Sequence, residues 1–129
     1  MIHPYSLDCS CEACVKAFRV EVPILKEFMY ELRRAEELHP NTSNIPHGVG
    51  GSGRVTYTKI AQASCDRAHK EGRLTHTHVH EEESAESYSA KTRKELRKEL
   101  VQVGAMTLKW ISAIDREVEA GANPEEELW

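Results

Sequence analysis

An apolar stripe near the C-terminus, over about Thr92–Ala120, places the strongest constraint on how this 129-residue chain folds. Its apolar residues recur every three or four positions, which is the spacing of one face of an α-helix. Gly121 follows the stripe, and glycine commonly ends helices. We therefore expect one long helix that forms the spine of the core. Its apolar face consists of Leu96, Leu100, Val103, Thr107, Trp110, Ile111, Ile114 and Val118.

Four further segments are predicted to be helical. Apolar residues recur at helical spacing over about Pro23–Leu38, and small apolar residues do so from Val55 to Gly72. Thr75 suits the N-terminal cap of a fourth helix, and a short helix is expected over about residues 11–20, after a cap at Asp8 or Ser10. The pattern predicts an all-α fold, a helical bundle of four to five helices. The expected core face of the second segment consists of Ile24, Leu25, Phe28, Met29, Leu32 and Ala35.

The length of the chain suits one domain with a real core. A composition of 40% hydrophobic, 29% charged and only 6% aromatic residues favours a helical globular protein. We therefore expect a single all-α domain over residues 1–129, with a cysteine-containing N-terminal extension over 1–22 that begins irregularly. Residues 39–54 contain two prolines and four glycines and are expected to form a long loop, either a linker or a lid over a ligand.

The charge of the chain limits its partners. A formal net charge of −4 argues against a nucleic-acid partner or an anionic membrane, since both require a clustered basic surface. No apolar run approaches the roughly 18 residues that span a bilayer, and the first ten residues lack the basic and apolar regions of a signal peptide. We expect a cytoplasmic protein that binds a small molecule, and any phosphate that it handles is expected to come with a metal ion.

Two pairs of oxygen-bearing side chains form the predicted chemical centre. Glu83 and Glu86 lie one turn apart on the expected fourth helix, and Glu99 and Gln102 lie one turn apart on the fifth. Twelve residues separate the two pairs, so the helices can face one another. Carboxylate and amide oxygens are ligands that suit Mg²⁺ or Mn²⁺. We therefore predict a divalent-cation site at these four residues.

At these residues the chain resembles the MazG-like nucleotide pyrophosphohydrolases of the all-α NTP pyrophosphatase superfamily, whose mark is EExxE followed by ExxD. The closer resemblance is to a group of small MazG-like proteins from bacteria and phages, and it covers about the last half of the chain. The matching positions are Leu74-Thr75, Glu82-Glu83-Ser84-Ala85-Glu86, Glu99 through Ala105, and Trp110 through Arg116.

The resemblance implies metal-dependent conversion of a nucleoside triphosphate, or a related nucleotide, to the monophosphate and pyrophosphate. Glu83, Glu86 and Glu99 would hold Mg²⁺, and Glu82 would be a candidate for the catalytic base. The chain departs from the family where Gln102 replaces an acidic ligand, because an amide brings no charge to offset the metal. The alternative is a protein that binds or sequesters a nucleotide without hydrolysing it.

Further contacts with the nucleotide are expected from Arg33 or Arg34, from Gln102, and from His78. His78 is the middle one of three alternating histidines, which we expect a helix to scatter over several faces.

The resemblance also implies a homo-oligomer, most simply a dimer, with the fourth and fifth helices near the contact. Independently, the fifth helix carries apolar residues on more than one face. A monomer in which the N-terminal helices cover this second face is the alternative. The residues that widen the apolar surface are Met106, Leu108, Trp110 and Ile111.

Three of the four cysteines crowd into the pattern Cys9-x-Cys11-x-x-Cys14. With His3 or Cys65 as a fourth ligand they could bind Zn²⁺ through sulfur and imidazole. The alternative is that these cysteines are small hydrophobic residues of the core. A zinc-stabilised helical adaptor is therefore a third functional hypothesis.

Overall fold

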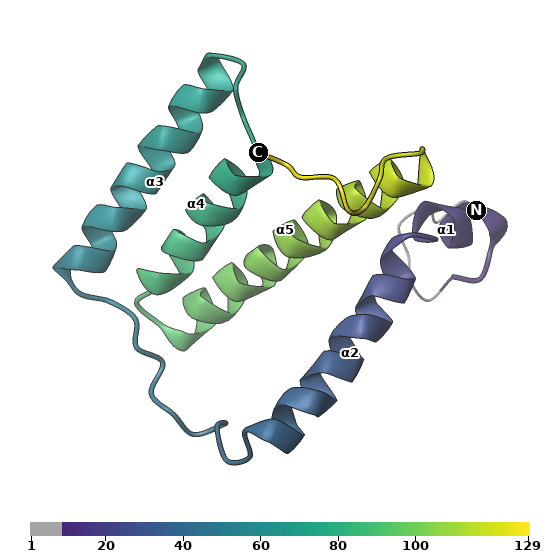
Figure 1. The fold of residues 1–129 in the computed structure, drawn as a ribbon. Helices are drawn as coiled ribbons and strands as arrows, with labels where there is room; N and C mark the ends of the chain where they lie inside the picture. Colours follow the sequence, from purple (N-terminus) through teal and green to yellow (C-terminus); the bar gives the residue numbers. More distant parts are fainter. Residues whose placement is uncertain (1–8) are drawn as a thin grey trace. The chain divides into compact units, whose positions relative to one another are not determined.

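The computed structural model describes residues 9–129, which form five helices and no strand. The prediction of an all-α protein with four to five helices is confirmed. The predicted irregular lead over residues 1–8, with Asp8 as a cap and His3 as a zinc ligand, lies outside the described residues. The helices, labelled in Figure 1, are α1 (Glu12–Ala17), α2 (Glu21–Leu38), α3 (Ser52–Lys70), α4 (His76–Tyr88) and α5 (Arg93–Glu119).

Most predicted helix ends agree with the structure. Thr75 caps α4 as predicted, because its side chain accepts a hydrogen bond from the backbone N–H of His78. The predicted cap at Ser10 is wrong, since Cys11 occupies the N-cap position of α1 without a side-chain cap bond. The loop is also shorter than predicted, because α3 begins at Ser52. Gly51 precedes this helix with φ of +96°, a conformation that favours glycine.

The chain divides into two compact units. The first contains the chain up to Ser43 together with Ile111–Trp129, and the second is Asn44–Trp110. The second unit therefore contains α3, α4 and the first part of α5. The earlier expectation of a single domain over residues 1–129 remains a prediction.

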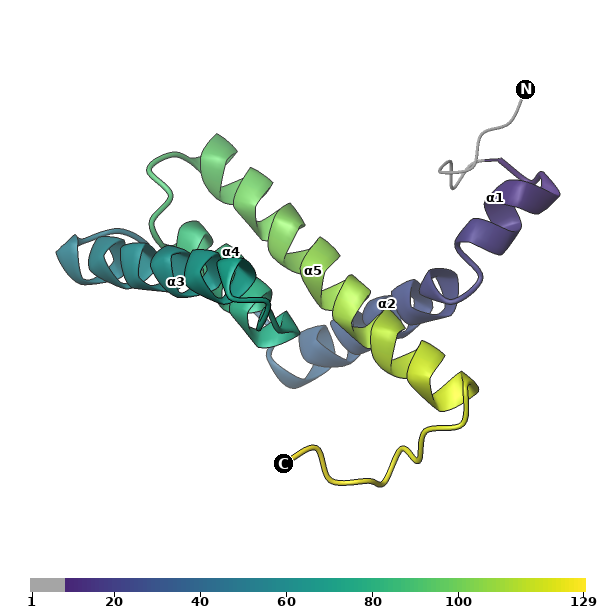
Figure 2. The ribbon, with the colours of Figure 1, turned by 90° about the horizontal axis from the view of Figure 1, so that it is seen from above.

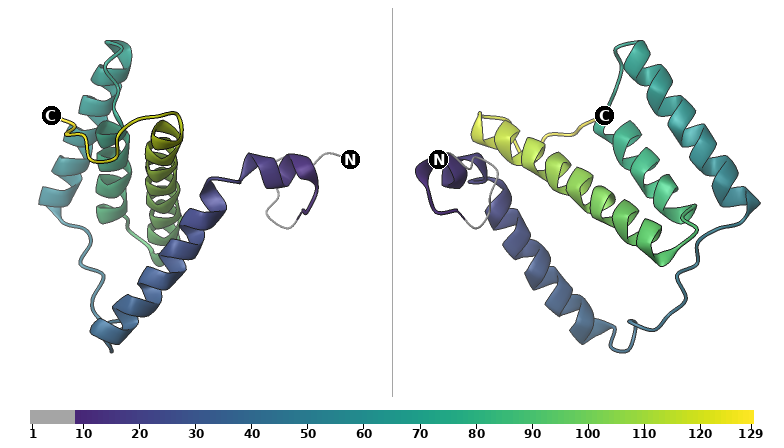
Figure 3. Two further views of the ribbon diagram at one scale, coloured as in Figure 1. Left: turned by 45° about the vertical axis from the view of Figure 1, so that its right-hand side comes forward. Right: turned by 180° about the vertical axis from the view of Figure 1, so that it is seen from behind.

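In the unit Asn44–Trp110, successive helices run in opposite directions, as Figure 1 and the rear view in Figure 3 show. The link between α4 and α5 is short and is visible from above in Figure 2. Small side chains fill the interface between α3 and α4, as the sequence predicted, so the two backbones approach closely. The buried small residues are Ala61, Cys65 and Ala68 on α3 and Ala85 on α4.

A buried hydroxyl also joins α3 to α4. The Thr58 Oγ1 atom lies 2.8 Å from the carbonyl oxygen of Ala85 and 2.9 Å from that of Arg54, and it contacts the Ser89 hydroxyl. Ser89 Oγ in turn donates to the Arg54 carbonyl oxygen at 3.1 Å. These contacts fix the position of α3 along the axis of α4.

In the other unit, two ion pairs connect the first residue of α2 and the segment before it to the end of α5. Arg116 Nη2 lies 2.7 Å from Glu21 Oε1, and Arg19 Nη1 lies 2.9 Å from Glu119 Oε1. Cys14, Val20 and Ile24 are the buried apolar residues here.

The predicted core face of α2 is only partly correct. Ile24 is buried, but Met29 and Leu32 are 65% and 53% exposed. Among the described residues of this unit, α1 and the last turns of α5 are the other helical elements, so within the unit little is available to cover the second half of α2. The predicted apolar face of α5 is also only partly buried, since Leu96 is buried while Leu100 is 51% exposed.

We expect the substitution Thr58→Val to lower the free energy of unfolding by about 1–2 kcal/mol, because it leaves a buried carbonyl of α4 without its donor. The thermal midpoint should fall by about 5 °C. Thermal unfolding followed by circular dichroism measures the change. Thr56→Val is the matched control, because Thr56 lies exposed on the same helix. Equal midpoints for the two variants would contradict the role of this hydroxyl.

Candidate metal centre

Three carboxylates meet between α4 and α5. Glu83 and Glu86 lie one turn apart on α4, and Glu99 lies on α5. One oxygen of each residue lies within 4.8 Å of those of the other two, and all three side chains are half-buried. The structure therefore brings together three of the residues that the sequence singled out.

The antiparallel register of α4 and α5 produces this meeting. One turn before Glu83, His80 Nε2 lies 2.9 Å from Thr107 Oγ1. The Thr107 hydroxyl donates its own proton to the Val103 carbonyl oxygen at 2.9 Å, so it accepts from the Nε2–H group of His80. Because α4 and α5 run in opposite directions, residues earlier in α4 face residues later in α5.

Gln102 completes the group. Its side-chain amide lies 3.3 Å from Glu83 Oε2 and 3.0 Å from Glu99 Oε2. With the amide nitrogen facing inward, Gln102 donates hydrogen bonds to both carboxylates. With the oxygen facing inward, the amide would offer a fourth oxygen to a cation. Gln102 can therefore hydrogen-bond to the carboxylates when no cation is bound and can turn its oxygen towards a cation when one is bound.

The carboxylates raise one another's proton affinity. Burial, followed by the charges of Glu86 and Glu99, raises the pKa of Glu83 above its usual value. Burial and the charge of Glu86 likewise raise the pKa of Glu99, although Lys98 opposes this. A cation bound among the three would remove this repulsion.

The donor set fits Mg²⁺ or Mn²⁺. All of the converging ligand atoms are hard oxygens, which these ions prefer over nitrogen or sulfur. Around an octahedral Mg²⁺ ion, neighbouring oxygens lie about 2.9 Å apart and opposite ones about 4 Å apart, so carboxylate oxygens within 4.8 Å of one another need to close in by up to about 2 Å. Water would complete the six ligands that Mg²⁺ requires.

Glu82, the predicted catalytic base, faces another partner. Its side chain hydrogen-bonds with the buried Cys65 thiol on α3. Burial and then Glu82 raise the pKa of Cys65 to about 11. This thiol thus already has a hydrogen-bond partner on α4, so the contact argues against Cys65 as the fourth ligand of the N-terminal cysteines.

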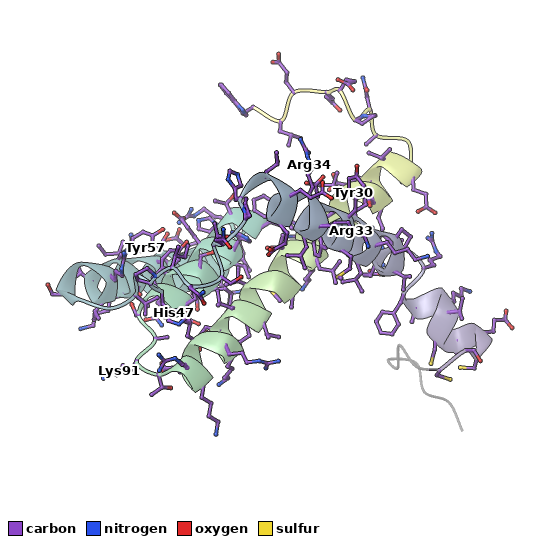
Figure 4. The ribbon with its side chains drawn as sticks, turned by 90° about the horizontal axis from the view of Figure 1, so that it is seen from below. Tyr30, Arg33, Arg34, His47, Tyr57 and Lys91 are labelled. Atoms are coloured by element: carbon purple, nitrogen blue, oxygen red, sulfur yellow. The ribbon has the colours of Figure 1, made fainter. Side chains whose placement is uncertain are left out.

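Of the other predicted substrate-binding residues, Arg33 and Arg34 lie on α2, while His78 lies near the start of α4. Figure 4 shows Arg33 and Arg34 on α2, in the unit that does not contain the carboxylates. Arg34 Nη1 lies 3.7 Å from Glu31 on the same helix. The His78 ring contacts Thr75, and its Nδ1 atom accepts from the backbone N–H of that residue at 3.1 Å. Contact of these three residues with a nucleotide stays a prediction.

An aromatic group at the start of α4 was not predicted. His76 stacks on Trp110 with ring centroids 5.7 Å apart, and His80 meets the edge of Trp110 at 5.6 Å. The expectation that a helix scatters the histidines is wrong for this pair, because residues four positions apart share a face. That spacing was the signal in the sequence. A cavity of about 230 Å³ adjoins the group, lined by Leu74, Thr75, His76, Val79, Met106 and Lys109.

Comparisons of the chain with protein-family models, with curated proteins and with solved structures found no match. Among the described residues, no helix is both long enough and apolar enough to cross a membrane. A functional interpretation of the metal centre therefore depends on its residues and their geometry.

The repulsion among the carboxylates predicts a pH dependence. Because the pKa values of Glu83 and Glu99 are raised on folding, the folded protein binds more protons than the unfolded chain at pH values just above 4.5. Stability contributed by these groups is therefore complete below that pH and is lost as the pH rises through the folded pKa values. At pH 7, with EDTA present, Glu99→Gln should raise the thermal midpoint by about 1–3 °C, because one like-charge contact is removed.

This advantage should shrink as the pH falls towards 4, and Mg²⁺ should reverse it by stabilising the wild-type protein more. Thermal unfolding between pH 4 and 7.5, in EDTA and in Mg²⁺, measures both effects. Glu117→Gln is the control, since Glu117 is exposed on the same helix. A Glu99→Gln variant that is less stable than wild type in EDTA at pH 7 would show that the carboxylates do not repel one another.

Proposed function

We propose that this protein is a metal-dependent nucleotide pyrophosphohydrolase, which converts a nucleoside triphosphate or a related nucleotide to the monophosphate and pyrophosphate. The observation that carries the proposal is the convergence of Glu83, Glu86 and Glu99 on one point between two helices. Three carboxylates this close together favour a divalent cation, and a cation held in this way can engage the phosphates of a nucleotide.

The residues have distinct roles in this proposal. Glu83, Glu86 and Glu99 hold the cation, and Gln102 turns its amide oxygen towards it. When bound, Mg²⁺ neutralises charge on the phosphate oxygens and polarises the phosphorus for attack by water. The half-buried position of the carboxylates limits the access of bulk water, which strengthens their hold on the cation.

Two further observations support a nucleotide as the ligand. The residues resemble the EExxE and ExxD pattern of the MazG-like enzymes, with Gln102 at the last position. The cavity with His76 in its wall lies on the same α4–α5 interface, about 10 Å along α4 from Glu83 by helical rise. An aromatic wall at that distance suits a ring-bearing ligand whose charged end reaches the cation.

A second candidate is a protein that binds a nucleotide without hydrolysing it. Gln102 favours this function, because it leaves the site with three carboxylates where the resembling family has four. The contact of Glu82 with Cys65 favours it as well, because Glu82 was the candidate base for activating water. In this function the three carboxylates would still hold a metal ion and the nucleotide would be released unchanged.

Purified protein with Mg²⁺ or Mn²⁺ should release pyrophosphate from at least one common or modified nucleoside triphosphate. Glu83→Gln and Glu99→Gln should each lower the rate by about 100-fold or more. Mutating a residue that only hydrogen-bonds to a metal ligand already lowers metal affinity or activity by about 10–100-fold, and these two residues would be ligands themselves. Glu117→Gln should leave the rate unchanged. Pyrophosphate detection and chromatography of the nucleotide products measure the reaction.

One variant separates the two candidates. Gln102→Glu restores a fourth carboxylate, so it should raise the rate if the missing charge limits catalysis. If neither wild type nor this variant releases pyrophosphate, and intact nucleotide is recovered after a saturated complex is denatured, the protein is a binder. Absence of both hydrolysis and metal-dependent nucleotide binding would reject both functions.

We also propose that the protein forms a homo-oligomer, most simply a dimer. Leu100 and Val101 on α5 are 51% and 57% exposed, and they line one cavity of about 490 Å³ with Leu96. A second copy packed on α5 would bury these side chains. Light scattering at micromolar concentration should give at least twice the 14.6 kDa mass of the chain, and Leu100→Lys with Val101→Lys should shift it to the monomer. A wild-type mass of one chain, with or without nucleotide and metal, would refute this prediction.

A further inference from the structure

The N-terminal cysteines converge on one point, in the unit that does not contain Glu83, Glu86 and Glu99, the acidic cluster between α4 and α5. The Sγ atoms of Cys9, Cys11 and Cys14 all lie within 4.8 Å of one another, and none of them forms a disulfide. Three of the four cysteines of the chain thus gather within six residues. We propose that Cys9, Cys11 and Cys14 form a thiolate site for Zn²⁺.

Local backbone structure explains the convergence. Cys11 is the N-cap residue of α1, and its carbonyl oxygen accepts the first helical hydrogen bond, from Val15 N at 3.0 Å. Cys14 lies three positions later, so its side chain stands on the same face of the first turn. Cys9 lies two residues before this N-cap residue, outside the helix, and its sulfur reaches the same point.

The distances fit zinc. With Zn–S bonds of about 2.3 Å, tetrahedral geometry places neighbouring sulfurs about 3.8 Å apart. Sulfurs within 4.8 Å of one another reach this spacing by closing in by up to about 1 Å. Thiolates are soft ligands that select zinc over Mg²⁺, so this site and the carboxylates between α4 and α5 select different ions.

Burial makes the site structurally consequential. Cys14 is 1% exposed and belongs to the small core that includes Val20 and Ile24, while Cys9 and Cys11 are half-buried. A cavity of about 410 Å³ adjoins Cys9 and Cys14 and gives an ion a route to the sulfurs. Helix α1 has six residues, too few to be stable alone, so a metal bridge would hold it against this core.

A disulfide accounts for the same residues less well. A disulfide uses two thiols and leaves the third without a role, whereas a tetrahedral metal site uses all three. Three thiolates also leave one coordination position of zinc for a further ligand. This proposal does not depend on the acidic cluster or on the activity proposed for it.

The test uses the reduced full-length protein, prepared without chelators and kept in excess Mg²⁺ to occupy the acidic cluster. Titration with Co²⁺ should give one equivalent of a tetrahedral complex with a sulfur-to-metal charge-transfer band, and Zn²⁺ should displace it. Cys9→Ser and Cys11→Ser should each weaken Zn²⁺ binding by more than about 100-fold, which exceeds the usual effect of losing an outer contact. Cys65→Ala should leave the band and the affinity unchanged.

A second measurement does not depend on the folding of the variants. Zn²⁺ should protect Cys9, Cys11 and Cys14 of the wild-type protein from alkylation, as counted by mass spectrometry of the peptide that contains them. Cobalt binding without a charge-transfer band, a band that survives Cys9→Ser and Cys11→Ser, or unchanged alkylation in Zn²⁺ would each overturn the proposal.

Discussion

The antiparallel register between α4 and α5 is the constraint on which the candidate site depends. A short connection after Tyr88 reverses the chain, and the contact between His80 and Thr107 fixes how the two helices align. With that alignment, Glu86 and Glu83 necessarily face Glu99 and Gln102. A shift of a single residue would rotate these side chains by about 100° and separate the carboxylates. The acidic cluster is therefore a property of the interface, and neither helix has it alone.

Behind α4, a second interface holds the pair in place. Alanine and cysteine side chains let α3 approach α4 closely, and Thr58 adds a polar contact whose geometry leaves little freedom for sliding. Close packing of small residues also means that α4 has no room to rotate about its axis. Repulsion among the carboxylates would otherwise be relieved by such a rotation, so the packing of α3 against α4 helps to keep Glu83 and Glu86 facing Glu99. A hydrogen bond from Gln62 Nε2 on α3 to Glu86 Oε1, at 3.2 Å, adds to this restraint.

Much of the fold and of the acidic cluster could be predicted from the sequence, because both depend on helical periodicity. The long stripe from Leu96 to Val118 and the cap at Thr75 are local signals, and local signals suffice to place helices. The meeting of Glu83, Glu86 and Glu99 also followed, because one helical turn and a short connection leave few other arrangements. The start of α3 at Ser52 did not, since a segment with glycines on both sides reads as loop. The contact between Glu82 and Cys65 could not be predicted, because it depends on the rotation of each helix about its axis, which periodicity does not specify.

The contacts along the α4–α5 interface follow a definite order. Carboxylates stand at the end near the chain reversal, the His80–Thr107 contact lies one turn away, and the stacked His76 and Trp110 rings lie at the far end. The interface thus has a polarity, from anionic at one end to aromatic at the other, over about two turns of helix. An elongated molecule with two unlike ends can align with it in one direction only. Orientation is thereby selected by the order of residues along two helices, before any specific contact to a substituent is made.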